Sequence, residues 1–196
     1  MHKLLITGGS GFIGSHTCLV FLNNGYELYV LDSNINSFPE VVDKVKSIAK
    51  NENLHFYKGD IRDRNILNKI FFDSQKNGEG IVGVIHFAGL KSVKNSIINP
   101  LEYWDSNVNG TVNLLKVMEI FDCRTIVFSS SATIYGNNTI IPISENTEIK
   151  PFNPYGHTKA SVEYILESVF KSSQAKWRIA NLRYFNPIGA HETGFI

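Results

Sequence analysis

The chain has 196 residues and a formal net charge of +1 at pH 7, with 43% hydrophobic and 19% charged residues. This length and composition are typical of one folded domain with a substantial core and exclude a disordered or fibrous chain. Because Lys and Arg are scattered along the sequence, no basic surface is indicated for nucleic acid or for an anionic membrane. We therefore expect neither nucleic acid nor a membrane as a partner.

Targeting signals, cysteines and histidines exclude further classes of protein. The N-terminus has too short an apolar run before Thr7 for a signal peptide, and no stretch is long enough to span a membrane, so we expect a cytoplasmic location. Cys18 and Cys123 stand far apart in apolar contexts, which favours buried, reduced thiols. The six histidines show no paired metal-ligand spacing with cysteines or acids, so we expect no metal site.

Short apolar runs alternate along the chain with longer segments of helical period, which is typical of βα units that build a parallel sheet. The predicted strands cover 3–7, 28–32, 54–59, 83–87, 125–130 and 177–184. The predicted helices cover 11–24, 38–50, 65–75, 101–122 and 154–173. We expect an α/β fold in a single domain, 1–196, with a doubly wound parallel sheet flanked by helices. The segment 131–153 has little periodicity, and so long a loop is usually functional, so it should border the active site.

Three glycines follow the first predicted strand directly and open the first predicted helix: Gly8, Gly11 and Gly14. They permit a tight turn, a close approach of the backbone to a pyrophosphate, and close packing of helix on strand. Free N–H groups at the helix N-terminus can then bind the anion. A glycine pattern alone would fit a structural turn equally well, but the strand and helix around it favour a Rossmann-type dinucleotide site.

Asp32 ends the second predicted strand, where a carboxylate can accept hydrogen bonds from the adenosine ribose hydroxyls. Its charge would repel a 2′-phosphate, and no arginine stands in the following residues 33–37. The sequence therefore predicts NAD rather than NADP as the cofactor. A solvated aspartate in a turn is the alternative reading of this residue.

Tyr155 and Lys159 are four residues apart at the start of a predicted helix, so their side chains share one face. A phenol with a pKa of about 10 is a poor base, but an adjacent ammonium stabilises the phenolate and lowers that pKa. Tyr155 could then take a proton from a sugar hydroxyl, and Ser131 at the end of the fifth predicted strand could orient the same oxygen. Such a pair is by itself more often a helix surface, and it is the neighbouring motifs that favour catalysis.

These features, in this order, resemble the extended short-chain dehydrogenase/reductase family and, within it, the sugar-nucleotide 4-epimerases. Further segments share the resemblance: 59–62 (GDIR), 86–91 (HFAGLK), 107–111 (NVNGT), 129–136 (SSSATIYG) and 183–190 (RYFNPIGA). It covers nearly the whole chain. The resemblance also implies a longer protein, so we expect a C-terminal substrate-binding region to be largely missing from these residues.

By this resemblance, a set of residues would form the NAD site. They are Gly8, Gly11, Phe12, Ile13, Gly14, Asp32, Ser33, Asn34, Ile35, Asn36, Ser37, Asp60, Ile61, Phe87, Ala88, Gly89, Leu90, Lys91, Ser106, Tyr155, Lys159 and Phe185. Ser106 stands where the epimerase pattern prefers asparagine. Ser131, Tyr155 and Lys159 would be catalytic, and the sugar nucleotide would contact Lys91, Ser131, Thr133, Tyr155 and Asn186.

The activity implied by the resemblance is the interconversion of UDP-glucose and UDP-galactose through transient oxidation at C4 of the hexose. Two alternatives remain open: another NAD-dependent sugar-nucleotide enzyme, such as a uronate epimerase or a decarboxylase, and a non-catalytic dinucleotide-binding module. Dehydration is disfavoured because Ala132 and Thr133 offer no carboxylate after Ser131. A homodimer through the helices near 101–122 and 154–173 is expected by the same resemblance.

Overall fold

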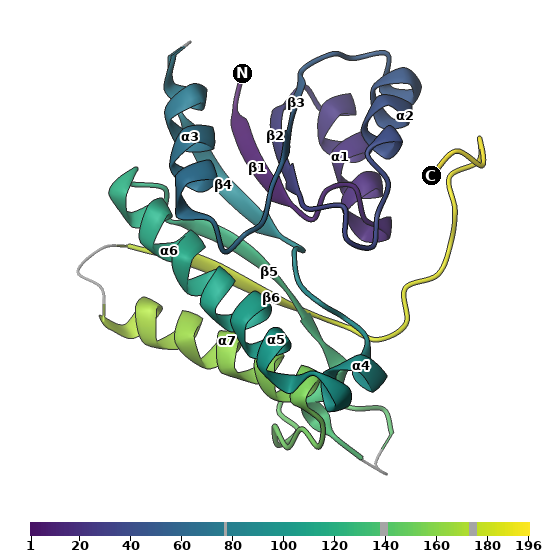
Figure 1. The fold of residues 1–196 in the computed structure, drawn as a ribbon, viewed down its shortest axis with the longest axis vertical. Coiled ribbons are helices and arrows are strands. Elements are labelled where there is room, and N and C mark those ends of the chain that lie inside the picture. The colour runs from purple at the N-terminus through teal and green to yellow at the C-terminus, as the bar shows by residue number, and fades with distance from the viewer. Residues whose placement is uncertain (77, 138–140, 173–175) are drawn as a thin grey trace.

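The computed structural model of the chain describes residues 1–76, 78–137, 141–172 and 176–196. Within them, six parallel strands form one sheet in the order β3-β2-β1-β4-β5-β6 (Figure 1). The strands are β1 (Lys3–Thr7), β2 (Glu27–Asp32), β3 (Leu54–Lys58), β4 (Ile81–His86), β5 (Thr125–Ser131) and β6 (Arg178–Tyr184). The strand order reverses between β1 and β4, which is the switch point of a doubly wound Rossmann-type sheet and confirms the predicted fold class.

Helices cover both faces of this sheet (Figure 1). The α-helices are α1 (Phe12–Asn23), α2 (Glu40–Ala49), α3 (Arg64–Gln75), α4 (Val93–Ile98), α5 (Pro100–Tyr103), α6 (Gly110–Ile120) and α7 (Pro154–Ser172). A π-helix, η1 (Trp104–Asn109), joins α5 to α6, and a 3-10 helix, η2 (Ala132–Tyr135), follows β5. Helices α1 and α2 pack on one face, while α3, α6 and α7 pack on the other.

Alternation of apolar side chains along each strand builds two cores, one on each face. In β1, Leu4 and Ile6 point to the core beneath α1 and α2, and Leu5 points to the core beneath α3, α6 and α7. In β2, Val30 points to the core beneath α1 and α2, and Tyr29 points to the core on the other face. Each fully buried leucine or isoleucine contributes roughly 1.5–3 kcal/mol. Both faces are therefore needed to hold the strands in the order that brings their carboxyl ends together.

The helix predicted over 101–122 is not one helix in the structure. It starts at Pro100, widens into the π-helix η1 and continues as α6. The reason is a tertiary contact, since the Asn107 amide bonds both the N–H and the C=O of Leu90, at 2.7 and 3.0 Å, and the Thr158 hydroxyl. π-Helical turns inside α-helices occur frequently at functional sites.

Other predicted boundaries differ by a few residues. The short helix α4 was missed, and its start is set by Ser92, whose hydroxyl accepts a hydrogen bond from the Asn95 N–H. The last residue of the helix predicted over 154–173 lies outside the described residues. The predicted starts of the strands and helices otherwise agree with the structure within two residues, as with β6, which begins at Arg178.

The segment predicted as a loop over 131–153 is partly ordered by contacts with the sheet, although 138–140 lie outside the described residues. It begins with η2, in which Ile134 and Tyr135 are buried. The Lys150 N–H returns to the Ile134 carbonyl at 2.8 Å, and this contact brings the chain back to the start of α7. Helix α7 therefore starts beside the end of β5.

No helix in the described part of the chain is long and apolar enough to cross a membrane. Cys18 and Cys123 are free and buried, as the sequence predicts, and burial raises the pKa of the Cys18 thiol to about 12 and that of the Cys123 thiol to about 11. Both thiols are therefore protonated, inert parts of the two cores.

Candidate active site

A cavity of about 780 Å³ opens at the carboxyl ends of the strands, at the switch point of the sheet. All the predicted site residues line it except Asn34. It also takes in residues that sequence reasoning did not single out: Ser10, Ser15, Leu31, Phe38, Val41, Gly59, Val93, Ser129, Ser130, Tyr184, Pro187 and Ile196. The chain therefore brings cofactor and catalytic candidates together in one cavity.

The glycine loop between β1 and α1 has no room for a side chain at Gly8 or Gly14. Gly8 has φ +72°, and a Cβ on Gly14 would lie 2.2 Å from the Gly8 carbonyl oxygen. Helix α1 begins after Gly11 without a side-chain cap, so the N–H groups of its first turn remain available to an anion. The Ser10 hydroxyl is buried and has no hydrogen-bond partner among the described residues. The loop thus fits a pyrophosphate.

Asp32 ends β2 beside this loop and is 8% exposed. Its carboxylate accepts hydrogen bonds from the Ser10 N–H, the Asn34 N–H and the Ser37 hydroxyl, each at 2.9 Å. These bonds aim the carboxylate at the cavity from a fixed position. Asn34 is the predicted site residue that does not line the cavity, because its left-handed backbone, with φ +57°, lets its amide bond Ser37 instead.

The Asp60–Ile61 segment after β3 is tied to the π-helix region. Arg62 pairs with Asp60 at 2.6 Å and with Asp105 at 2.9 Å. The hydrogen bond from Arg62 lowers the pKa of the Asp60 carboxyl. On the other side, Ile61 packs closely on Gly110. A Cβ added to Gly110 would lie 2.6 Å from the Ile61 side chain. This segment of the cavity wall is therefore anchored on both sides, by Arg62 and by Gly110.

Tyr155 stands in the first turn of α7, which packs against the end of β5. Asn153 caps the helix, since its side-chain oxygen accepts the Gly156 N–H at 2.8 Å. A Cβ on Gly156 would lie 3.0 Å from the Thr133 carbonyl oxygen, so glycine favours this close approach of α7 to η2. The Ser131 hydroxyl accepts hydrogen bonds from the Thr133 N–H at 3.2 Å and the Thr133 hydroxyl at 3.0 Å, and it lies close enough to the Tyr155 phenol to affect the pKa of that phenol.

Lys159 lies one turn further along α7 and is 5% exposed. Its ammonium donates to the Ser129 carbonyl at 2.6 Å and sits 4.7 Å from the Phe128 ring centre and 5.9 Å from the Tyr155 ring centre. Burial lowers the pKa of Lys159 to about 8. The ammonium is thus still mostly charged at neutral pH, and it lies between the cavity and the core.

The expected direction of the Tyr155 pKa is wrong for the chain without ligand. Burial raises the pKa of Tyr155, and the hydrogen bond from Ser131 opposes that rise. Lys159 does not lower it because its ammonium is directed at the Ser129 carbonyl. An added positive charge in the cavity would be needed to favour the phenolate.

His86 at the end of β4 is a fully buried part of the framework that sequence reasoning quoted only within a motif. It hydrogen-bonds the Thr7 hydroxyl at 2.6 Å and the Thr111 hydroxyl at 2.9 Å. Thr111 donates its own proton to the Asn107 carbonyl, so the Nε2 of His86 donates to Thr111 and Nδ1 accepts from Thr7. Burial, helped by the charge of Lys159, lowers the pKa of His86 to about 3.

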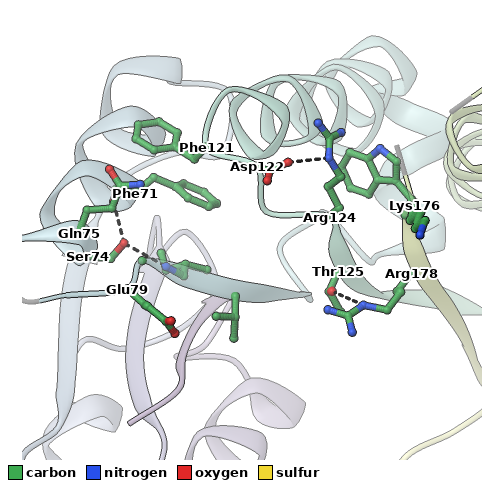
Figure 2. Close-up of a pocket in the computed structure, with 14 residues that line it drawn as sticks. Phe71, Ser74, Gln75, Glu79, Phe121, Asp122, Arg124, Thr125, Lys176 and Arg178 are labelled. Carbon is green, nitrogen blue, oxygen red and sulfur yellow. Dashed lines mark hydrogen bonds and ion pairs between the residues drawn. The ribbon is translucent and has the colours of Figure 1, made fainter. Parts of the chain in front are cut away.

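A second hollow, of about 760 Å³, lies at the opposite, amino ends of β4, β5 and β6 (Figure 2). There Asp122 pairs with Arg124, and Arg178 hydrogen-bonds Thr125. The Arg124 guanidinium also lies over the Trp177 ring, 5.9 Å from its centre. None of the predicted site residues lines this hollow. Among the described residues, no group of three or more His, Cys, Asp or Glu side chains is placed to hold a metal ion.

The doubly wound sheet, the glycine loop and the Ser-Tyr-Lys group at one edge define the class of Rossmann-fold proteins with extended short-chain dehydrogenase/reductase motifs. The chain belongs to the NAD dependent epimerase/dehydratase family, whose model matches residues 4–196. Among curated relatives, it is 45% identical over 195 residues to the bifunctional UDP-glucose 4-epimerase and UDP-xylose 4-epimerase 1 of Pisum sativum, covering 98% of this chain and 54% of that protein.

Other comparisons agree. The UDP-glucose 4-epimerase of Bacillus subtilis (strain 168) is 45% identical over 193 residues, covering 98% of this chain and 55% of that protein. A crystal structure of UDP-glucose 4-epimerase from Bifidobacterium longum in complex with NAD+ and UDP is 42% identical and superposes with a TM-score of 0.93. It covers 99% of this chain and 56% of that one. The chain spans about half the length of the relatives that it matches.

Proposed function

We propose that residues 1–196 are the NAD-binding and catalytic domain of an epimerase that interconverts UDP-glucose and UDP-galactose. The observation that carries the proposal is the meeting of Ser131, Tyr155 and Lys159 in the cavity of the glycine loop. The names of the relatives, and the NAD+ and UDP in the solved structure, support the reaction and the ligands.

NAD fits the features on the cofactor side of the cavity. Its pyrophosphate would lie on the loop from Gly8 to Gly14 and its adenosine ribose on Asp32, with Asp60 and Ile61 near the adenine. Among the other predicted cofactor residues, Phe87 to Lys91, Ser106 and Phe185 line the same cavity. The Asp32 carboxylate next to the ribose supports NAD over NADP.

In the proposed reaction, Tyr155 removes the proton of the C4 hydroxyl while Ser131 holds the same oxygen. Bound NAD would accept the C4 hydride and return it to the other face of the keto sugar, so that C4 inverts without net oxidation. When NAD is bound, the positive charge of the oxidised nicotinamide would oppose the burial that raises the pKa of Tyr155. As the resemblance implies, Lys159, which lines the cavity, would also bond the nicotinamide ribose.

On the substrate side, Lys91, Thr133 and Asn186 line the same cavity and are proposed contacts of the sugar nucleotide. In this proposal, they would surround the hexose. The relatives are about twice as long as this chain, and we propose that the uridine pocket of the whole enzyme needs a part that these residues do not include.

We further propose a homodimer and a cytoplasmic location. Large apolar side chains are exposed near 101–122 and 154–173, among them Leu101, Ile120 and Phe170, and they could pack as a bundle of four helices between two copies. Two free thiols suit a reducing compartment. Sedimentation as a monomer at micromolar concentration would count against the dimer.

The test is turnover of UDP-galactose to UDP-glucose by the purified chain with NAD+, measured beside Tyr155→Phe. We expect the variant to lose activity by at least about 100-fold, because the base is gone. Tyr164→Phe is the matched control, since Tyr164 is a tyrosine of the same helix that is 69% exposed, and it should keep full activity.

Other outcomes separate the alternatives. Bound NAD without turnover of any UDP-hexose would indicate a dinucleotide-binding module. Turnover of UDP-glucuronate in place of UDP-galactose would indicate a uronate epimerase or a decarboxylase. Equal activity of Tyr155→Phe and the unmodified chain would contradict the proposed base.

A further inference from the structure

A second polar cluster lies directly behind the Ser131–Tyr155–Lys159 group. Its centre is Glu163, one turn beyond Lys159 on α7, which is 6% exposed and does not line the cavity. The Glu163 carboxylate accepts a hydrogen bond from the Ser130 hydroxyl. Ser130 immediately precedes Ser131, so this bond links the helix of Tyr155 to the strand end that carries Ser131.

Arg183 completes the cluster from β6. Its guanidinium donates to both carboxylate oxygens of Glu163, with the shortest contact at 2.7 Å, and the two side chains are 20% and 7% exposed. The remaining nitrogen, Nη1, donates to the Tyr135 hydroxyl at 2.7 Å and to the Glu145 carbonyl at 3.0 Å. Arg183 is thus shared between α7, η2 and the segment that leads to α7.

The four segments that meet at this cluster are those that carry the candidate catalytic and substrate residues. The end of β5 carries Ser131, η2 carries Thr133, α7 carries Tyr155, and the chain after β6 carries Phe185 and Asn186. Each of them contributes a hydrogen bond to Glu163 or Arg183 or lies next to a residue that does.

The chemistry of the pair favours a geometric role over a stabilising one. Burying a carboxylate and a guanidinium costs several kcal/mol each in lost hydration, and apolar residues of similar volume often give equal stability. What a two-pronged arginine–carboxylate pair supplies is a fixed distance and a fixed angle between the elements that carry it. A shift of about 1 Å between reacting groups can reduce a rate by roughly 100-fold.

We propose that Glu163 and Arg183 are positioning residues, which hold α7 in register with the ends of β5 and β6 so that Ser131 meets the Tyr155 phenol. The proposal rests on the proposed function in assigning Tyr155 as the base. The geometric part concerns the contact between Ser131 and Tyr155 and is measurable without turnover.

The experiment compares Glu163→Gln with Glu167→Gln. Glu167 is one turn further along the same helix and pairs with Lys171 on the surface, so its variant removes a similar charge pair without touching the cluster. We expect Glu163→Gln to lower kcat by roughly 10–100-fold per NAD-loaded chain, with KM and NAD affinity within about twofold. Glu167→Gln should match the unmodified chain in every measurement.

A second readout follows the phenol itself. In chains with ¹³C-labelled tyrosine, the Tyr155 signal is identified by its loss in Tyr155→Phe and titrated with pH by NMR. Loss of the Ser131 hydrogen bond should move this titration to higher pH in Glu163→Gln and leave it in place in Glu167→Gln. An unmoved titration in Glu163→Gln overturns the proposal, whether or not the unmodified chain turns over UDP-galactose, while absent turnover by the unmodified chain counts only against the proposed function.

Glu163→Gln leaves the Arg183 charge half-buried without its partner and could unfold the chain. The double variant Glu163→Gln/Arg183→Met removes that charge and should recover the thermal midpoint. We expect kcat to stay low and the Tyr155 titration to stay shifted in the double variant. If kcat and the Tyr155 titration returned to their original values together with the thermal midpoint, the pair would serve stability alone and the proposal would be overturned.

Discussion

The two ends of the sheet hold cavities of nearly equal volume, about 780 Å³ at the carboxyl ends of the strands and about 760 Å³ at the amino ends. Their chemistry differs. The carboxyl-end cavity gathers an uncapped helix start, the buried Ser10 hydroxyl, which has no partner in the described part of the chain, and the buried ammonium of Lys159. The amino-end hollow is lined by charged side chains, of which Asp122 pairs with Arg124 (Figure 2), and its buried atom without a hydrogen-bond partner among the described residues is a cationic nitrogen, Nη1 of Arg124. Volume alone therefore does not identify a site.

The direction of the chain explains the difference. In a doubly wound sheet every strand ends at the same edge, where the following helix begins and presents free N–H groups. The opposite edge receives helix C-termini, here those of α3 and α6 near Gln75 and Phe121, which present carbonyl groups. Anionic ligands are therefore favoured at the carboxyl edge, and the basic side chains at the amino edge, such as Arg124, lie beside the helix C-termini.

The largest expected effect is at the glycine loop, and Gly14→Ala tests it. A Cβ on Gly14 would lie 2.2 Å from the Gly8 carbonyl oxygen and 2.7 Å from the Gly9 Cα, so the loop must move. We expect NAD affinity to fall by about 1000-fold, equivalent to about 4 kcal/mol. In the first half of β4, a Cβ on Gly83 would meet only side chains at 3.4 Å or more, so Gly83→Ala should leave NAD affinity unchanged. Unaltered NAD binding by Gly14→Ala in calorimetry would remove the glycine loop from the site.

The next effect is a loss of stability in acid caused by His86. Its pKa is about 3 in the folded chain, against 6.5 for an ordinary histidine, so the unfolded chain takes up a proton between these values and the folded chain does not. His86 therefore contributes to the free energy of unfolding above pH 6.5. This contribution is lost as the pH falls, by about 3 kcal/mol between pH 7 and pH 4.

Chemical denaturation over this range measures the loss. His86→Gln should make the free energy of unfolding depend less on pH, because the group that titrates is gone. His55→Gln removes a half-exposed histidine on β3 and should leave the dependence as it is. An NMR titration in which the His86 ring takes up a proton above pH 5 would contradict the buried neutral form.

A smaller effect is expected from Asp32→Ala. Removal of the carboxylate that bonds the ribose should weaken NAD binding about 30-fold, close to 2 kcal/mol, and should narrow the preference for NAD over NADP. Asp122→Asn is the counterpart at the other end of the sheet, where the side chain is 85% exposed, and it should change neither affinity. If Asp32→Ala weakened NAD and NADP binding equally, Asp32 would only support the loop through Ser10, Asn34 and Ser37.

Much of this site is readable from local sequence. Gly8, Gly11 and Gly14 at a strand-to-helix junction, and Tyr155 four residues before Lys159, are local patterns whose geometry follows from backbone conformation and helical period. Both patterns predicted residues that now line one cavity. Asn34 was the exception, because a left-handed backbone turned its side chain toward Ser37, and the sequence 33–37 carries no sign of that turn.

The sequence by itself determined the parallel α/β class, the cofactor edge and the candidate catalytic pair, since these depend on period and on neighbours within a few residues. Only the tertiary structure decided the π-helix that Asn107 opens, the rise of the Tyr155 pKa, and the cluster of Glu163 with Arg183. The physical reason is the same for all three. Desolvation and side-chain hydrogen bonds depend on which groups from distant segments lie within a few ångströms, and that proximity exists only after the two cores have packed.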